Sequence, residues 1–240
     1  MNKLIYILLI LAITSCDEAL FNAGDIETKS IEVSSFKEIY IDDIFEVYLI
    51  QDTTCNIEAK GGNNLLSDLE FTVDEEKKLT ISDNNSARWS RDYNKIELYI
   101  SVDTLNYLRL NAPCNVISVN TLTTLNFKIW SITDFAEFDL TLDCENFYFV
   151  NNNTSGGIMF VQGVTANLNF WARGSFIVNA ENLIADQVTV KNESMADCRV
   201  YANDYLSVEI LRAGRVFYKG NPTTIEYVND KAKEQLIKLD

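Results

Sequence analysis

Carboxylate pairs are the residues of this chain whose types could support acid–base chemistry. Asp134, Glu137 and Asp139 lie within six residues, and the last two would share one face of an extended strand. Two carboxylates at a suitable separation can act as acid and base on a glycosidic bond. However, the chain has 35 acidic residues, so chance pairs are expected, and no histidine is present to act as a base near neutral pH. We therefore expect no enzyme activity. The alternative is a polysaccharide hydrolase or lyase that uses surface carboxylates.

Aromatic side chains could support a second kind of chemistry, the recognition of a ligand. Trp130 and Trp171 occupy equivalent positions of a repeat described below, and Trp89 and Arg91 lie in a locally basic and aromatic segment. Indole rings and guanidinium groups suit sugars and carboxylates. We predict that these four residues bind a ligand. The alternative is that neighbouring segments cover them.

Metal and cofactor chemistry is not indicated by the sequence. The absence of histidine excludes imidazole ligands. Asp83, Asn84 and Asn85 offer oxygen atoms of the kind that calcium prefers, but they lack the spacing of an EF-hand loop. We therefore expect neither a metal nor a cofactor.

The elements that would position these residues are short strands that recur about every 20 residues between positions 105 and 220. In each motif two apolar residues flank one outward residue, and this alternation has the period of a β-strand. Repeats that are too short to bury their own apolar face are typical of solenoids. The sequence therefore predicts an all-β, single-domain parallel β-helix with about 20 residues per coil, right-handed as parallel crossovers prefer. The six motifs are Leu108-Arg109-Leu110, Phe127-Lys128-Ile129, Phe147-Tyr148-Phe149, Leu168-Asn169-Phe170, Val188-Thr189-Val190 and Val208-Glu209-Ile210.

Stacking these motifs would place equivalent residues in columns with a step of about 4.8 Å. The middle outward column would read Arg109, Lys128, Tyr148, Asn169, Thr189 and Glu209. The next outward column would read Asn111, Trp130, Val150, Trp171, Lys191 and Leu211. Four of the six members of this second column are large and apolar, and a row of such side chains facing water often marks a contact site.

The flanking segments have other expected roles. Residues 1–15 are typical of a lipoprotein signal peptide, because a short apolar run ends in Ile13-Thr14-Ser15-Cys16, which resembles a bacterial lipobox. Cys16 would then carry the lipid that anchors the protein to a membrane. We expect a polar tether over residues 16–30, the solenoid with antiparallel N-terminal strands over 31–228, and a short capping helix over 229–240.

Three of the other four cysteines are predicted to be free thiols. Cys114 and Cys198 occupy similar coil positions about four rungs apart, which is beyond the reach of a disulfide. Cys144 falls about half a coil out of phase with both. We expect these three to be buried thiols in the core. The position of Cys55 cannot be assigned from the repeat.

Four short stretches, in this order along the chain, resemble motifs of the head GIN domain family. This is a family of auto-transporter adhesins from Bacteroidetes, many of them lipoproteins. The resemblance covers roughly residues 31–225; it implies a β-helix and a role in adhesion, and it brings no catalytic residues. The stretches are Phe45-Glu46-Val47-Tyr48-Leu49-Ile50-Gln51, Asn64-Leu65-Leu66, Leu79-Thr80-Ile81 and Tyr218-Lys219-Gly220-Asn221-Pro222.

These observations together predict a recognition protein of the cell envelope, held at the outer membrane by its lipid on the periplasmic or the outer side. A net charge of −15 disfavours nucleic acid and anionic lipid as partners. The expected partner is a glycan or a protein, bound through an outer face of the β-helix, and the only expected membrane contact is the lipid anchor. A structural envelope protein is a further alternative. The sequence does not indicate an oligomeric state.

Overall fold

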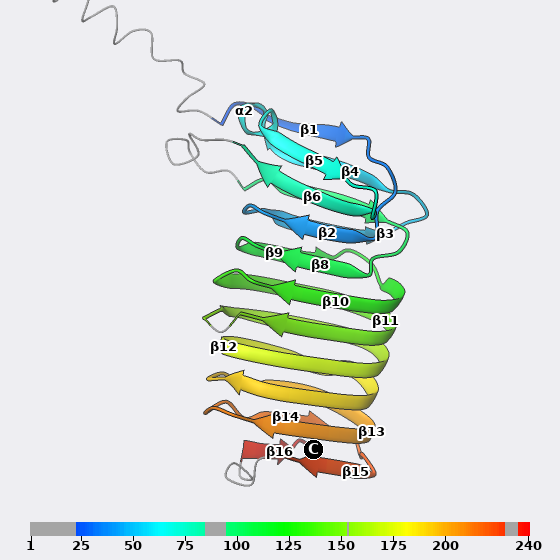
Figure 1. Cartoon of the computed structure of the whole chain (residues 1–240), viewed down its shortest axis with the longest axis vertical. Helices are drawn as coiled ribbons and strands as arrows, with labels where there is room; N and C mark the ends of the chain where they lie inside the picture. Colours follow the sequence, from blue (N-terminus) through cyan, green and yellow to red (C-terminus); the bar gives the residue numbers. More distant parts are fainter. Residues whose placement is uncertain (1–22, 85–94, 153, 229–234) are drawn as a thin grey trace, which may run out of the picture.

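The structure is a computed structural model that describes residues 23–84, 95–152, 154–228 and 235–240. Over these ranges the chain winds into a β-solenoid of about six turns with a spacing of about 21 residues (Figure 1). Antiparallel strands lie at its N-terminal end. The predicted all-β parallel β-helix is confirmed.

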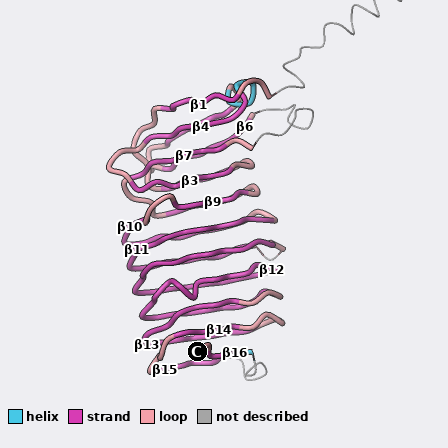
Figure 2. Tube along the Cα trace, turned by 180° about the vertical axis from the view of Figure 1, so that it is seen from behind, coloured by secondary structure: helices cyan, strands magenta, loops and turns pink. Residues whose placement is uncertain are grey.

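The N-terminal half builds the first coils and covers their open end. Two parallel stacks start the solenoid: β2 pairs with β6 and β8, and β3 pairs with β7 and β9. Antiparallel pairing of β1 with β4, β4 with β7, and β5 with β6 closes this end (Figures 1 and 2). The elements are β1 (Ile26–Ile31), β2 (Glu38–Ile41), β3 (Glu46–Gln51), β4 (Asn56–Gly62), α2 (Asn63–Leu66), β5 (Leu69–Val73), β6 (Lys78–Asp83), β7 (Glu97–Val102), β8 (Tyr107–Leu110) and β9 (Cys114–Ser118).

The remaining strands form regular coils, and all their pairings are parallel. Three of them are long because the chain turns corners without leaving the strand conformation, so that β12 runs through more than one coil. The elements are β10 (Leu122–Ser131), β11 (Phe135–Asn151), β12 (Gly156–Ser194), β13 (Cys198–Ile210), β14 (Val216–Lys219), β15 (Thr224–Tyr227) and β16 (Leu236–Lys238).

Two expected boundaries are wrong. The tether predicted over residues 16–30 overlaps β1, because Ile26–Ile31 pairs with β4 in a register that joins Ile26 to Gly62. The side chains of β1 are mostly exposed, so its sequence shows no apolar face that would indicate a paired strand. The capping helix predicted over residues 229–240 contains a strand in the part that the structure describes: Leu236–Lys238 forms β16 and pairs with β14.

The core is a stack of inward apolar side chains supplied by the alternation within each strand. Phe127 stacks on Phe147 with ring centroids 5.8 Å apart, and Phe149 meets Phe170 edge to face at 6.0 Å. These rings are almost completely buried. Burial of an aromatic side chain is among the largest single contributions to the stability of a core.

The cysteine prediction is confirmed, since Cys114, Cys144 and Cys198 are free and buried. Burial raises the pKa of the Cys144 and Cys198 thiols, which keeps them in the unreactive protonated form. Cys55, which the repeat left unassigned, is free and half-buried.

Two buried asparagines hold the corners of successive coils. The Asn151 amide donates to the carbonyls of Asn152 and Arg173, and its oxygen accepts from the N–H of Arg173. Asn192 donates to the carbonyls of Ala196 and Arg215 and accepts from the N–H of Ser194. Each side chain thus satisfies backbone groups that the turn would otherwise leave unpaired. The corners fix where the strands of the outer faces begin and end.

No helix in the described part of the chain is both long and apolar enough to cross a membrane.

Candidate recognition surface

The two predicted tryptophans lie on one sheet of the solenoid, here called the front sheet, which contains β2, β8 and the later part of β10. Trp130 is paired in register with Val150, and Val150 with Trp171, so the two indoles lie two rungs apart as predicted. Both side chains point outward, because their neighbours Ile129 and Phe170 are buried.

The predicted columns are wrong at both ends. Arg109, and not Asn111, pairs with Trp130, while Glu209, and not Leu211, pairs with Lys191. The sequence suggests a constant step between paired residues. The observed step is longer than this between Arg109 and Trp130 and shorter between Lys191 and Glu209.

The outward residues of the front sheet therefore form two adjacent columns. The tryptophan column consists of Arg109, Trp130, Val150, Trp171 and Lys191. The tyrosine column consists of Tyr107, Lys128, Tyr148, Asn169 and Thr189.

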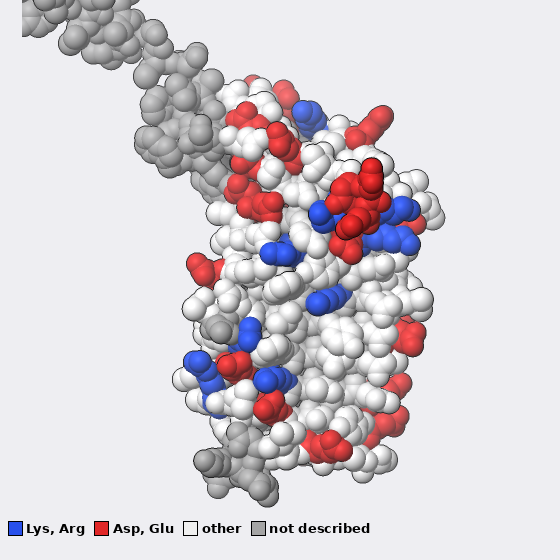
Figure 3. Space-filling model, viewed as in Figure 1, with Lys and Arg blue, Asp and Glu red and all other residues white. Residues whose placement is uncertain are grey.

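A groove of about 480 Å³ runs along these two columns and is here called the aromatic groove. Trp130 is 39% exposed and Tyr148 46% exposed, whereas Trp171 is half-buried. The described segments therefore leave the groove open, and the covering expected under the alternative interpretation is not provided by them. Figure 3 shows Lys and Arg side chains set in a largely uncharged surface over the middle of this face. The groove is lined by Lys128, Trp130, Tyr148, Phe149, Val150, Asn169, Phe170, Trp171, Arg173, Thr189 and Lys191.

Cations flank the Trp171 ring closely. The Arg173 Cζ lies 3.8 Å from the ring centroid, and the Lys191 Nζ lies 4.9 Å from it. The indole Nε1 donates to Glu193 Oε2 at 3.2 Å, and the same oxygen pairs with Arg173 Nε at 3.4 Å. Cation–π contact and this shared carboxylate fix the orientation of the ring. Trp171 is thus a rigid part of the groove that offers only part of its surface.

The surroundings of Trp130 are more open. The Arg109 Cζ lies 5.0 Å and the Lys128 Nζ lies 6.0 Å from its ring centroid. Beyond Arg109 the column continues to Tyr40, whose ring centroid lies 5.7 Å from the same Cζ and 5.4 Å from the ring of Tyr107. Aromatic and cationic side chains therefore alternate from β2 to β10.

The predicted binding residues omit several members of this surface, among them Tyr40, Tyr107, Arg109, Lys128 and Arg173. The columns predicted from the sequence put Arg109 in line with Lys128 and so separate Arg109 from Trp130, the ring that it contacts. Tyr40 lies on β2, which precedes the regular repeats, and its pairing with Arg109 joins segments 69 residues apart. The local excess of cations and aromatic residues in an acidic chain was the available signal.

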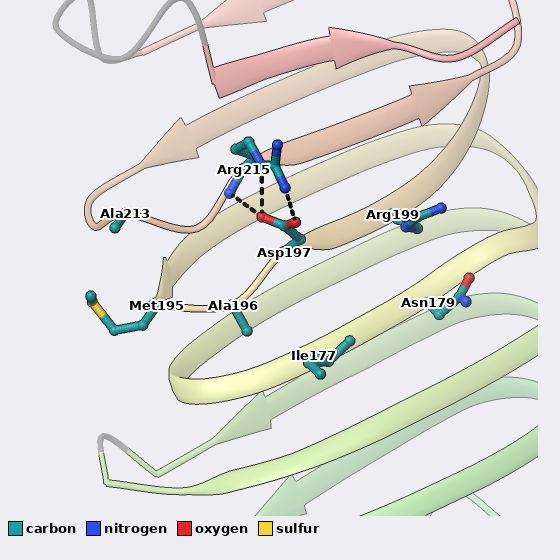
Figure 4. A pocket seen from close by; sticks show the side chains of 8 residues that line it. All are labelled: Ile177, Asn179, Met195, Ala196, Asp197, Arg199, Ala213 and Arg215. Carbon is teal, nitrogen blue, oxygen red and sulfur yellow. Dashed lines mark hydrogen bonds and ion pairs between the residues drawn. The ribbon is translucent and has the colours of Figure 1, made fainter.

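A second hollow, here called the ionic depression, lies where β12, β13 and β14 succeed one another on another side of the coil (Figure 4). Its volume is about 550 Å³. Arg215 holds Asp197 through Nη2–Oδ2 at 2.7 Å and Nε–Oδ1 at 3.2 Å, and its backbone N–H also donates to Oδ1. The Arg215 hydrogen bond holds the pKa of Asp197 below its usual value. The lining residues are Ile177, Asn179, Met195, Ala196, Asp197, Arg199, Ala213 and Arg215.

The carboxylates considered for acid–base chemistry lie away from both hollows. Glu137 and Asp139 are exposed on β11 and pair with residues of β9 and β12. Asp134 is also exposed. None of the three lines the aromatic groove or the ionic depression. Within the described ranges, no group of three or more His, Cys, Asp or Glu side chains is placed to hold a metal ion.

The predicted lipidation site Cys16 and the predicted binding residues Trp89 and Arg91 lie outside the described residues. Their roles stay predictions.

Comparison with protein families gives one match over most of the chain. The family described as "Putative auto-transporter adhesin, head GIN domain" matches residues 35–222. The chain belongs to this family. The resemblance drawn from the sequence is thereby confirmed, and the family name suggests a non-enzymatic protein of the cell surface or envelope.

Solved structures share the fold of this head GIN domain protein. A putative adhesin from Bacteroides fragilis is 20% identical, with a TM-score of 0.81, and the alignment covers 91% of this chain and 97% of that one. A putative adhesin from Parabacteroides merdae is 14% identical, with a TM-score of 0.63 and coverage of 90% and 97%. A putative lipid binding protein from Parabacteroides distasonis is 17% identical, with a TM-score of 0.57 and coverage of 90% and 98%. The comparison with curated proteins finds no match.

Proposed function

We propose that this protein is a lipid-anchored adhesin of the cell envelope that binds carbohydrate through the aromatic groove. The observation that carries the proposal is the pair of outward tryptophans, Trp130 and Trp171. They lie one rung on either side of Val150, and no described segment covers them. With a strand spacing of about 4.8 Å, their backbones are about 10 Å apart. Such a spacing suits two alternate sugar rings of one extended chain.

The construction of the groove supports binding without rearrangement. Phe149 and Phe170 form part of its floor and belong to the buried core, so the strands that carry the tryptophans are fixed by packing. A rigid surface avoids the entropy cost of ordering side chains on binding. Family membership supports the location at the envelope, and the sequence Ile13-Thr14-Ser15-Cys16 supports the lipid anchor.

A binding role accounts for the groove better than catalysis does. None of the residues that line the aromatic groove is a carboxylate. Hydrolysis of a glycosidic bond by the usual route needs two carboxyl groups beside the bond. The groove therefore offers contact surface and cations, but no acid–base pair.

The proposal is tested with a glycan array probed by the full-length chain purified in detergent. The matched variants are Trp130→Ala/Trp171→Ala in the groove and Phe217→Ala, an aromatic residue that lies under cations in the same way but on β14. We expect glycan signals that are lost in the double variant and kept in the control. Glycan signals unchanged in the double variant, or release of shortened sugars, would contradict the proposal.

The lipid anchor is tested separately by mass spectrometry of the protein isolated from membranes. We expect the mature N-terminus at Cys16, with a lipid attached to its sulfur, and loss of membrane retention in Cys16→Ser. An unmodified Cys16 in the membrane fraction would contradict the anchor.

A further inference from the structure

We infer that the carbohydrate bound in the aromatic groove is anionic, with a carboxylate or sulfate group held between Arg109 and Lys128. This inference rests on the proposed function and adds to it the chemical class of the ligand. It comes from the way in which charge is distributed over the front sheet.

The two columns of the front sheet contain cations but no carboxylates. Their ten residues include Arg109, Lys128 and Lys191 and no Asp or Glu, although the chain has 35 acidic and 20 basic residues. Glu38 and Glu209 lie in register just beyond the two ends. The patch is therefore positive against an acidic background, as Figure 3 also shows for this face.

Lys128, Arg173 and Lys191 line the groove and Arg109 borders it at Trp130, and these four cations differ in their partners. Lys191 pairs with Glu209 at 3.4 Å, and Arg173 pairs with Glu193 at 3.4 Å. Lys128 and Arg109, in contrast, form no ion pair with any carboxylate among the described residues. The Arg109 Nε donates to the side-chain oxygen of Asn111 at 2.9 Å, and Asn111 in turn donates to Asp42.

The position of this unpaired charge beside an open ring suits an acidic sugar. Arg109 and Lys128 belong to adjacent strands, and both lie within 6.0 Å of the Trp130 ring. A sugar ring resting on Trp130 would therefore carry its acidic substituent to both cations. Charge-assisted hydrogen bonds from Arg and Lys to carboxylate or sulfate are stronger than hydrogen bonds between neutral groups.

The net charge of −15 does not prevent this recognition at short range. Charges are screened over about 8 Å at physiological ionic strength, so a group in the groove responds mainly to its immediate neighbours. The next carboxylate along the tyrosine column, Glu38, is separated from Lys128 by the strand that carries Tyr107. Binding should weaken as salt concentration rises.

The test measures affinities of the full-length chain in detergent for polygalacturonate, dextran sulfate, neutral dextran and polyglutamate. The groove variant is Arg109→Gln/Lys128→Gln. The control is Arg199→Gln/Lys219→Gln, which removes two cations that pair with Glu181 on another side of the coil. Arg109→Lys/Lys128→Arg keeps both charges and shows whether the site tolerates substitution.

We expect one or both acidic polysaccharides to bind more tightly than dextran and polyglutamate. In the groove variant this affinity should fall about tenfold, the loss of one or two charge-assisted contacts, with little change in the control and in the charge-keeping variant. Comparison of the two acidic polymers identifies carboxylate or sulfate as the preferred group.

Other results would separate the two proposals. Dextran bound as tightly as the acidic polymers, with no effect of the groove variant, would overturn the anionic ligand and leave carbohydrate recognition intact. Polyglutamate bound as tightly as the acidic polysaccharides would overturn the assignment to a sugar. No binding of any polysaccharide here or on the glycan array would overturn the proposed function itself.

Discussion

The aromatic groove and the ionic depression lie on different sides of one solenoid and have similar volumes, about 480 and 550 Å³. They differ in how their cations are used. In the depression Arg215 is held by Asp197, and Arg199 lies 3.6 Å from Glu181. Lys128, which lines the groove, and Arg109, which borders it, lie against an indole without a carboxylate partner in the described chain. The hollow whose charges are already paired has little to offer a ligand, whereas the groove has two cations without a carboxylate partner beside its exposed ring.

The difference extends to the core beneath each hollow. Phe149 and Phe170 lie under the groove, while Phe176, Val178 and Cys198 are inward neighbours of residues that line the depression. The support beneath the depression thus combines one large aromatic residue with smaller side chains. This contrast can be measured by substitution.

The largest effect is expected from Phe149→Ala. Phe149 contacts the rings of Phe138, Phe170 and Phe176 at centroid distances between 5.0 and 6.0 Å. Its truncation should lower the free energy of unfolding by about 4 kcal/mol, against about 2 kcal/mol for Val178→Ala beneath the depression. Urea denaturation measures both. Equal losses would show that the two faces are supported equally.

The next largest effect is expected from the corner asparagines. Asn151→Ala and Asn192→Ala each remove three hydrogen bonds from a buried turn, which should cost about 2–3 kcal/mol in the free energy of unfolding. Only Asn151 holds the backbone of Arg173, a residue of the groove. We therefore expect Asn151→Ala to weaken glycan binding and Asn192→Ala to spare it, as measured by titration at a temperature where both are folded. The reverse pattern would assign binding to the depression.

A smaller effect is expected from Glu193→Gln, which keeps an acceptor for Trp171 Nε1 and removes the charge that pairs with Arg173. Freeing this cation should strengthen the binding of an acidic glycan about threefold, in line with the modest energy of an exposed ion pair. Binding of a neutral glycan should not change. Weaker binding of the acidic glycan in this variant would mean that Glu193 itself contacts the ligand.

The smallest effect is expected from the pH dependence of the ionic depression. The pKa of Asp197 is lowered by Arg215, so the folded state binds this proton less readily than the unfolded state does. The pair therefore adds stability above the unfolded pKa of about 4, and this contribution is lost as pH falls through the lower folded pKa. The free energy of unfolding, measured as a function of pH, should be higher for the wild type than for Asp197→Asn near neutral pH, and this difference should disappear under acidic conditions. A difference that grows as pH falls would contradict the assignment.

Much of the fold could be predicted from the sequence because alternation and period are local signals. The register from Phe127 through Phe147 to Leu168 follows from them and is confirmed. The shift at Arg109 and Glu209 could not be seen, because a slip of two residues leaves every inward side chain inward. Similarly, β1 is mostly exposed and depends on pairing with β4, which no local pattern encodes.

The candidate site could be predicted only in part. The two tryptophans stand out by type and spacing, but their cations depend on the true register and on side-chain direction. Arg173 follows Trp171 by two residues on β12, and its contact with the ring depends on side-chain direction. Tyr40 comes from a strand outside the regular repeats, and its pairing with Arg109 joins segments distant in sequence, which requires the three-dimensional structure.

The most direct test of recognition by the aromatic groove is a titration of the best glycan found on the array. It compares the wild type, Trp130→Ala/Trp171→Ala and Arg199→Gln/Arg215→Gln. We predict a dissociation constant about 100-fold or more weaker in the tryptophan variant, as for the loss of two central aromatic contacts, and an unchanged value in the depression variant. Weakening in the depression variant alone would place recognition on the other side of the solenoid and contradict the account.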